Sequence, residues 1–368
     1  MDPDWSIWVH DLKTGAPIAP LTVKLGAQGD SWSTGTSGNG TSTTTIVMDE
    51  EDPWTPAYTA SLLKPNDRMI VRWWGVNGGA DPGDAPMYAH KIEDWAYSLD
   101  GDTITVTSVD LLGETKWRMI GGADSDKHLT LTVTNRTPSG AVAQVMARMM
   151  QWSPDWQYPL DLPADAPGTF KGGPWVFWEG RSMGEILDEI RKRAGVEIYL
   201  RPYATASGGI RFQVRVGSPV TIGGANFNLL ADESPLSGIT YRVDGAQQVT
   251  GLLGLGNGTG EDQETAHQDG TVKIAIRDTK KSFDDLTGDA LQEAVDTYYY
   301  ANVDPIIQWD IGAFTIGGGY EPEHSAPGRV FNVELYGNPV IPDGVHTLRV
   351  INVSGDNGPQ LKPEVQGA

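Results

Sequence analysis

The stretch GRSMGEILDEIRKRAGVEIYLRPY (180–203) carries the clearest local fold signal in this chain of 368 residues. Its apolar residues recur at helical spacing on one face: Met183, Ile186, Leu187 and Ile190. Ser182 is a favourable residue before the first helical turn, and Gly195 is a favourable residue after the last one. The following residues alternate as strands do around a Ser-Gly-Gly turn, so the sequence predicts a helix at 183–194 and a hairpin at 196–216.

A second helix is predicted upstream, where PSGAVAQVMARMMQW (138–152) indicates a helix at about 140–152 with Ser139 as its N-cap. Two helices followed by a hairpin indicate an α/β module over residues 121–235. Net charge also sets this region apart, because residues 121–240 hold 12 acids and 11 bases while the flanks carry net charges of −9 and −11. A nearly neutral module between two acidic flanks indicates a different environment for the middle of the chain.

The two flanks are predicted to be strand-rich. Apolar and polar residues alternate in several stretches bounded by turn residues: WSIWVHDL (5–12), DRMIVRWWG (67–75), DTITVTSVDLL (102–112) and RVFNVELYG (329–337). One helix is expected at about 287–301. The Gly/Ser/Thr-rich segment 27–45 is either a flexible loop or a hairpin of low hydrophobicity. The predicted fold is therefore mainly β with an inserted α/β module, and its barrel-like β domains occupy residues 1–120 and 236–368.

Composition excludes several classes of protein. The chain has 27 Lys and Arg against 48 Asp and Glu, a net charge of −21, which is the opposite of a basic duplex-binding surface. It contains no Cys and no apolar run long enough to span a bilayer. Its first residues lack the basic and apolar regions of a secretory signal. We therefore expect no specific nucleic-acid binding, no stable membrane association and no disulfide or thiolate chemistry.

The segment Gly180-Arg181-Ser182-Met183-Gly184 matches the G-x-S-x-G nucleophile elbow of α/β-hydrolases. Asp296 and His324 follow it in the chain order of such a triad. The same residues also fit a capping box, in which Ser182 caps the helix and Glu185 bonds back to the cap residue. The capping box is favoured, because a hydrolase of this class needs many alternating strands and helices. No catalytic residue is predicted.

Other candidate motifs are weak. The run GLLGLGNGTG (251–260) fails the dinucleotide fingerprint, since Thr259 replaces its third glycine and no helix follows. The acidic cluster 49–52 lacks the spaced ligands and the turn glycine of a calcium loop. The six histidines stand singly, without metal-ligand spacing: His10, His90, His128, His267, His324 and His346. We expect no metal and no cofactor.

Sugar recognition is an alternative function. The chain has 13 Trp, and acidic, Trp-rich β proteins often bind sugars by stacking aromatic rings on them. Glu321 and Glu323 flank Pro322 in an expected loop, and glycoside hydrolysis uses paired carboxylates. Nothing in the sequence singles out this pair among 48 acids. A glycan-degrading or carbohydrate-binding all-β protein is therefore kept as the alternative.

The order of the segments resembles that of tail-hub proteins of long-tailed, siphovirus-like bacteriophages, in particular the minor tail proteins of phages that infect actinobacteria. The resembling segments are WSIWVHDLKTGAPIAPL (5–21), LLKPNDRMIVRWWG (62–75), ITVTSVDLLGETKWRM (104–119), SMGEILDEIRKRAGVEIYLRP (182–202) and TLRVINVSGDNGPQLKPEV (347–365, including Arg349). No single one of these motifs is specific to the family, whereas their order along the chain is. They cover about a third of the chain and are spread over its whole length.

The resemblance implies a non-enzymatic virion protein, made in the host cytoplasm and located at the tail tip. It implies a homotrimer whose two barrels per chain make a pseudo-sixfold ring. We expect the module 121–235 on the outside of the assembly, because its nearly neutral charge contributes little to a negative channel. The implied partners are the distal tail protein, the tape measure protein and tip or fibre proteins. We expect an acidic lumen that repels the phosphates of passing DNA, and we expect excess Trp and Tyr to anchor interfaces.

Overall fold

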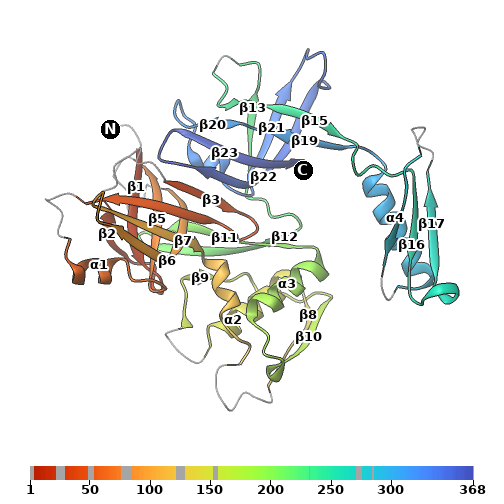
Figure 1. Cartoon of the computed structure of the whole chain (residues 1–368), viewed down its shortest axis with the longest axis horizontal. Coiled ribbons are helices and arrows are strands. Elements are labelled where there is room, and N and C mark those ends of the chain that lie inside the picture. The colour runs from red at the N-terminus through yellow and green to blue at the C-terminus, as the bar shows by residue number, and fades with distance from the viewer. Residues whose placement is uncertain are drawn as a thin grey trace. The chain divides into compact units, whose positions relative to one another are not determined.

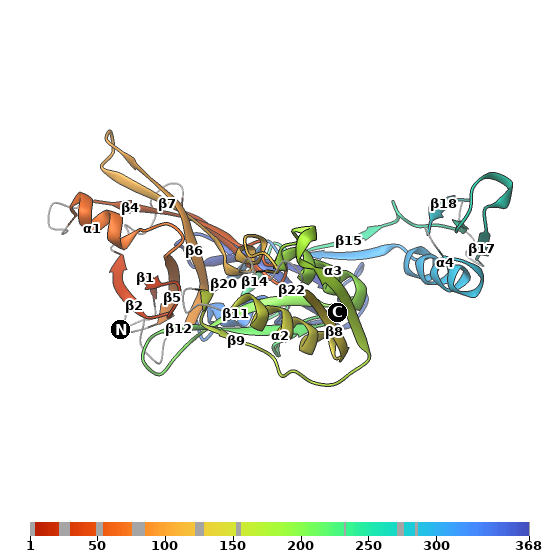
Figure 2. The same ribbon diagram turned by 90° about the horizontal axis from the view of Figure 1, so that it is seen from below.

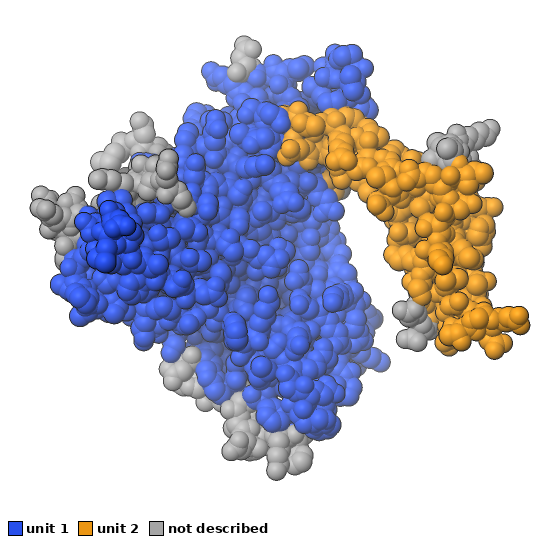
Figure 3. All heavy atoms as spheres, in the orientation of Figure 1, with its two compact units in different colours: residues 1–238, 311–366, 368 blue, residues 239–310, 367 orange. Residues whose placement is uncertain are grey.

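A computed structural model describes the protein at the following residues: 4–21, 30–48, 54–75, 85–121, 129–151, 156–231, 233–270, 276–283 and 286–367. The chain forms two compact units, which Figure 3 shows in different colours. Unit 1 consists of Met1–Gly238 together with Ile311–Gln366, and unit 2 consists of Ile239–Asp310. Strands dominate over helices (Figure 1), so the prediction of a mainly β fold is confirmed.

The large sheet of unit 1 and its connections contain most of the strands. These are β1 (Asp4–Asp11), β2 (Pro17–Leu21), β3 (Ser31–Gly35), β4 (Thr41–Val47), β5 (Arg68–Gly75), β6 (Ala85–Ser98), β7 (Thr103–Asp110), β13 (Gly224–Asn228), β14 (Leu236–Ser237), β20 (Ala313–Thr315), β21 (Val330–Leu335), β22 (Gly344–Gly355) and β23 (Gln360–Gly367). Their order is β14-β20-β23-β22-β3-β4-β7-β6-β5-β1-β2, and β13 and β21 are attached through β22. The helical segments beside them are α1 (Pro56–Leu62), η1 (Leu111–Lys116) and η6 (Pro322–Ser325).

One sheet thus runs through both predicted β domains. The junction is the antiparallel pair β3–β22, in which Gly35 lies opposite Asn352. The Gly/Ser/Thr-rich segment 27–45 forms the hairpin β3–β4 over its described residues, which decides between the two alternatives left open by the sequence. Barrel closure of either half stays a prediction.

The α/β region of unit 1 contains the predicted helices and hairpin. Its elements are β8 (Thr130–Arg136), α2 (Pro138–Met149), β9 (Leu160–Asp161), β10 (Phe170–Val176), η4 (Phe177–Glu179), α3 (Met183–Ala194), β11 (Glu197–Ala204) and β12 (Ile210–Gly217). The predicted N-cap Ser139 is wrong. Thr137 caps α2 by accepting a 3.1 Å hydrogen bond from the Gly140 amide, because Pro138 is suited to the first helical position.

The core of the α/β region continues into the β sheet. Val142 and Ile190, from α2 and α3, share one buried cluster with Met69 and Trp73 of β5. Contacts therefore place this region in unit 1 together with both β segments. The boundaries 1–120, 121–235 and 236–368 stay a prediction.

Unit 2 consists of a small sheet, a helix and a ribbon. Its elements are β15 (Thr240–Asp244), β16 (Gly251–Leu255), η5 (Gly260–Asp262), β17 (Thr265–Asp269), β18 (Asp278–Ser282), α4 (Gly288–Asn302) and β19 (Ile306–Asp310). The sheet order is β17-β16-β18, and β15 pairs with β19. Its small core packs α4 on the sheet through Leu252, Leu291 and Val295, and α4 lies where the helix 287–301 was predicted.

Among the described residues, no helix is both long and apolar enough to cross a membrane.

Candidate functional site

Short, mostly hydroxylated side chains cover one face of five adjacent strands, β6, β7, β4, β3 and β22. We call this surface the hydroxyl face. Its members are Ser31, Ser33, Thr41, Thr43, Thr45, Val47, Asp94, Ala96, Ser98, Thr103, Thr105, Thr107, Val109, Asn352 and Ser354. All of them are partly or fully exposed, and Asp94 alone is charged.

Strand pairing places these residues together. Thr43 lies opposite Thr107 and Thr45 lies opposite Thr105, while the alternate residues of the same strands point inward and are buried. β-Branched threonine suits a pleated, half-exposed surface, and cross-strand threonine pairs stabilise it. The sequence pattern TSTTTIV therefore produces a flat face with little side-chain relief.

Charged residues lie beside the hydroxyl face at its edges. Ser33, Asn352 and Glu364 line one cavity of about 310 Å³, so β23 continues the surface with charged residues. At another edge, β6 and β7 extend as a hairpin, which Figure 2 shows projecting from the rest of unit 1. Leu99 in the turn of this hairpin is 82% exposed. A chain in which 20% of residues are charged thus has one broad face that is almost neutral.

A buried polar cluster is formed by residues of β1, β3, β5 and β6. Arg72 is fully buried, and its guanidinium lies 5.5 to 5.8 Å from the ring centroids of Trp5, Trp32 and Tyr88. Among the described residues no carboxylate forms an ion pair with Arg72, and its Nη2 has no hydrogen-bond partner. The three aromatic faces therefore stabilise a buried cation.

A clasp joins this cluster to the turn between β22 and β23. Trp32 Nε1 and Arg72 Nη1 each donate to the Asp356 carbonyl at 3.0 Å, and Trp5 Nε1 donates to the Gly358 carbonyl at 3.1 Å. The Asn357 amide donates to the Asp30 carboxylate. Donors from the first 72 residues thus fix a turn near residue 357, which holds the N-terminal and C-terminal parts of the hydroxyl face together.

Two histidines are buried in the N-terminal strands. Nδ1 of His90 lies 3.1 Å from Ser42 Oγ, and Nδ1 of His10 lies 3.0 Å from the Gly15 carbonyl. Nε2 of each ring has no partner among the described residues. Burial lowers the pKa of His10 to about 4, against the hydrogen bond to Gly15, and it lowers the pKa of His90 to about 3. Both rings are therefore neutral near pH 7.

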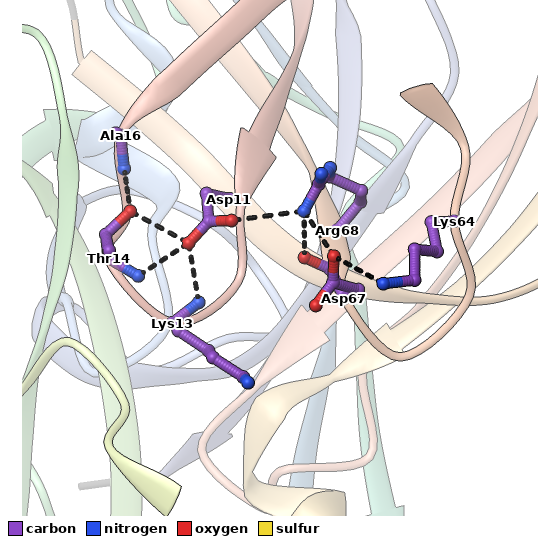
Figure 4. A network of polar contacts seen from close by, with 7 residues as sticks. All are labelled: Asp11, Lys13, Thr14, Ala16, Lys64, Asp67 and Arg68. Atoms are coloured by element: carbon purple, nitrogen blue, oxygen red, sulfur yellow. Dashed lines mark hydrogen bonds and ion pairs between the residues drawn. The ribbon is translucent and has the colours of Figure 1, made fainter. Parts of the chain in front are cut away.

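The β1–β2 turn is fixed by the polar network of Figure 4. The Asp11 carboxylate accepts from the amides of Lys13 and Thr14 and pairs with Arg68 at 3.1 Å. Burial would raise the pKa of Asp11, but these hydrogen bonds and the charge of Arg68 lower it overall. The turn contacts β12 closely, since Ile210 N donates to Gly15 O at 2.8 Å. Gly15 is required there, because it has φ of +73° and an added Cβ would lie 1.9 Å from Ile210 O.

Ion pairs join the α/β region to the C-terminal strands. Arg349 is almost fully buried and binds both carboxylate oxygens of Glu197, at 2.7 and 2.8 Å. Glu323 lies between Arg201 at 2.5 Å and Arg329 at 2.6 Å. Glu321 and Glu323, the carboxylate pair considered for glycoside hydrolysis, therefore have different structural roles. Two guanidinium groups neutralise Glu323, while Glu321 forms the cap of η6 with His324.

Ser182 of the candidate elbow is a helix cap. Its Oγ accepts from the Glu185 amide at 3.2 Å, and its own amide donates to the Glu185 carboxylate at 2.7 Å. The side chain is buried at the start of α3, and Gly195 ends that helix with φ of +61°. The capping-box interpretation is confirmed, and these hydrogen bonds orient Ser182 toward the helix amides.

The remaining candidates stay separate. His267 lies on β17, and the glycine run 251–260 supplies β16 before a loop. His128 and the acidic cluster 49–52 lie outside the described residues. Within the described ranges, no group of three His, Asp or Glu side chains has the geometry of a metal site.

More tryptophan side chains are buried within the chain than the expectation of interface anchors suggested. Trp5, Trp32, Trp73 and Trp175 are buried within the chain, so much of the aromatic excess stabilises this fold. The hydroxyl face was not predicted from the sequence. Its signal was the Ser/Thr-rich segment 27–45, which becomes a surface only when the distant strands β6 and β7 pair beside it.

No protein-family model matches the chain, and no curated protein matches it. Several solved structures are similar to it. The chain is similar to the 43 kDa tail protein of prophage MuSo2 from Shewanella oneidensis, with 12% identity, a TM-score of 0.55 and coverage of 98% of this chain and 97% of that one. It is similar to the tail protein from Neisseria meningitidis MC58, with 10% identity, a TM-score of 0.55 and coverage of 98% and 96%.

A third similar structure is the half-lidded Francisella PdpA–VgrG complex, with 8% identity and a TM-score of 0.55. All of this chain is covered, but only 58% of the Francisella chain. These likenesses show that the chain has the fold of phage tail proteins and of a VgrG-complex component. They agree with the resemblance to tail proteins at the level of fold, and the siphovirus type and the actinobacterial host stay predictions.

Proposed function

We propose that the protein is a non-enzymatic structural component of a phage tail, a hub at the distal tip whose hydroxyl face lines the DNA channel. The observation that carries this proposal is the hydroxyl face itself. It is broad, flat and almost uncharged, and it crosses from the N-terminal to the C-terminal strands of a chain that has the fold of phage tail proteins. The clasp at the Asp356–Gly358 turn holds its two parts together.

Strand spacing supports a channel of suitable width. Eight strands are consecutive from β14 to β6. At a strand spacing of about 4.8 Å they span about 38 Å, so three copies side by side would give a circumference of about 115 Å and a diameter of about 37 Å. Such a ring is wider than a DNA duplex. The number three comes from the resemblance to tail hubs, and the homotrimer is part of the proposal.

The chemistry of the face suits the passage of DNA. Lys and Arg bind phosphate and make affinity depend on salt, and none of the fifteen members of the face is basic. The expectation of an acidic lumen is modified here, since Asp94 is the one carboxylate on the face. Weak adhesion of DNA to the face then follows from the absence of Lys and Arg on it more than from repulsion between carboxylates and phosphates.

The proposed neighbours are the distal tail protein above the ring, the tape measure protein, and tip or fibre proteins below it. The α/β region around α2 and α3 is proposed to lie outside the channel. The tail-tip location is tested directly by antibodies against the chain, which should label one end of the tail in electron micrographs of the particle that contains it. Labelling along the tube, at the head or nowhere on the particle would contradict the proposal.

Arginine substitutions test the channel face. Thr43→Arg and Thr105→Arg should give the purified protein salt-sensitive affinity for duplex DNA and should slow genome release from assembled particles. Thr132→Arg, at an exposed position of β8 away from the face, is the matched control. Equal effects of all three substitutions would contradict channel lining. Turnover of cell-wall glycan or polysaccharide by the purified chain would instead support the glycan-degrading alternative.

A further inference from the structure

A cavity of about 330 Å³ lies where the β3–β4 turn, β6 and the D-L-L-G turn meet. Its polar and aromatic lining includes Asn39, Glu93, Asp110, Lys116 and Trp117. Cavities of this size with a few convergent polar groups are typical small-ligand sites. Thr41 and Val109 of the hydroxyl face also line this cavity, so it lies at the edge of that face. The polar and aromatic groups named above are not members of the face and have no part in the tail role described above.

Trp117 is the aromatic element of the site. Its side chain is 77% exposed, and no ring or cation contact of it is present among the described residues. The backbone is fixed, because Trp117 N donates to Glu114 O at 3.0 Å at the end of η1. A large indole ring thus lines the cavity without a ring or cation partner among the described residues.

Asp110 is the buried polar group of the site. It is 7% exposed and lines the cavity. Its carboxylate accepts from the Leu112 amide at 2.8 Å, and this is its one hydrogen bond within the described residues. Burial raises the pKa of Asp110 to about 6, against the effect of that hydrogen bond. A carboxyl group with a spare oxygen inside a cavity is a hydrogen-bonding group available to a ligand.

The other polar groups are of mixed type. Glu114 is neutralised by buried Lys91, whose Nζ lies 2.5 Å from its carboxylate. Glu93 is an exposed acceptor and Lys116 is a donor, while the Asn39 amide supplies both and has no hydrogen-bond partner in the described part of the chain. A cationic ligand would meet Lys116, and an anionic ligand would meet Glu93 and Asp110. Donors and acceptors that line one cavity together with an aromatic ring instead match the hydroxyl groups and the apolar face of a sugar.

We propose that this cavity binds a neutral saccharide, with one sugar ring stacked on Trp117 and its hydroxyl groups hydrogen-bonded to Asp110, Glu93 and Asn39. The ligand is a carbohydrate of a surface or a wall, and its binding is additional to the structural role. Because binding is a property of the single chain, its failure would leave the tail assignment untouched.

The test uses the full-length protein and a panel of soluble sugars: maltotriose, cellotriose, chitotriose, mannotriose and lactose. At least one should bind with a millimolar or lower Kd and quench tryptophan fluorescence. Trp117→Ala should weaken that binding at least about tenfold, and Trp117→Phe should retain part of it. Trp178→Ala is the matched control, because Trp178 is 69% exposed and is not among the residues that line this cavity.

Two results with the sugar panel would overturn the inference. One is the absence of binding of every sugar in the panel at tens of millimolar. The other is binding that Trp178→Ala weakens as much as Trp117→Ala does. Preferential binding of a lysine- or arginine-rich peptide, lost in Trp117→Ala, would assign the cavity to a basic protein partner and would also contradict a saccharide site. Thermal unfolding of each variant checks that the fold is intact, as expected for an exposed side chain.

Discussion

The two faces of the strands β4 and β7 use the same residue types for different purposes. Thr43, Thr45 and Thr107 lie on the exposed hydroxyl face, whereas Ser42 and Ser108 lie inside, where their Oγ atoms are 2.5 Å apart. Outside, a hydroxyl group bonds to water whatever its neighbours are. Inside, each hydroxyl needs a partner within the chain, since an unpaired buried group costs about 1–3 kcal/mol.

This difference separates stability from function along a single strand. Inward substitutions should change the free energy of unfolding, because they alter packing or hydrogen bonds next to the clasp. Outward substitutions should leave stability nearly unchanged and act on what the face contacts. The following predictions test that separation, beginning with the largest effect.

Trp32→Ala should destabilise the protein most. Trp32 is 3% exposed, donates to the Asp356 carbonyl and packs on the buried Arg72. Loss of its volume and of one wall around the guanidinium should cost about 3–5 kcal/mol in the free energy of unfolding. Denaturant unfolding measures this loss. The exposed Trp178→Ala variant should change by less than about 0.5 kcal/mol, and equal losses in both would contradict an internal clasp.

Acid should destabilise the fold through the buried His10 and His90. Because their folded-state pKa values are about 4 and about 3, against an ordinary 6.5, the unfolded chain binds more protons between these values. Stability is therefore fully present above pH 6.5 and falls as the pH is lowered toward 4. Asp110 acts in the opposite direction between pH 3.8 and about 6, so two histidines are opposed by one carboxyl.

The net acid loss should amount to a few kcal/mol at about pH 4, at about 1.4 kcal/mol per unit of pKa shift. Thermal unfolding across pH 4 to 8 measures it. His90→Gln should flatten the profile, although this variant is less stable at pH 7. A flat profile for the unmodified protein would show that the two rings are solvated and would contradict their burial.

Ser42→Ala and Thr44→Val should have opposite signs although they are two residues apart on the inner face. Ser42 bonds to Ser108 and His90, so its loss should cost about 1–2 kcal/mol. The buried Thr44 hydroxyl has no partner among the described residues, so replacing it with a methyl group should stabilise the fold by up to about 1 kcal/mol. Thr45→Val on the outer face is the control, with no change expected in denaturant unfolding.

Local features of this fold could be predicted from sequence where short-range chemistry decides them. The helix 183–194 with its cap at Ser182 and its end at Gly195 is confirmed, because capping and periodicity lie within one stretch. The start of α2 was misplaced by two residues, since Thr137 and Ser139 are both good caps and Pro138 favours the first.

Long-range features could not be predicted. The hydroxyl face depends on pairing β3 with β22, which joins residues more than 300 positions apart, as Gly35 and Asn352 show. The clasp likewise depends on Trp32 meeting Asp356. Alternation indicated which residues share a face, but it carries no information about which strands are neighbours. The proposed saccharide cavity also combines two separate turns and strand β6, and no spacing in the sequence joins Asn39 to Trp117.

The smallest expected effect concerns charge on the outer face. Three copies of a chain with a net charge of −21 bring together 3 × −21 = −63 formal charges, so the proposed trimer should associate more tightly as salt screens this repulsion. Thr45→Asp adds a carboxylate where copies would face one lumen, and it should weaken association only slightly and only below about 0.1 M salt, where the Debye length exceeds about 10 Å. Sedimentation velocity across a salt series, with the neighbouring tail proteins added, measures both effects.

Thr132→Asp adds the same charge on β8, away from the hydroxyl face, and should weaken association less. A monomer at every ionic strength would contradict the trimer. A trimer whose salt dependence is the same with and without Thr45→Asp would support the ring but contradict the placement of the hydroxyl face in its lumen.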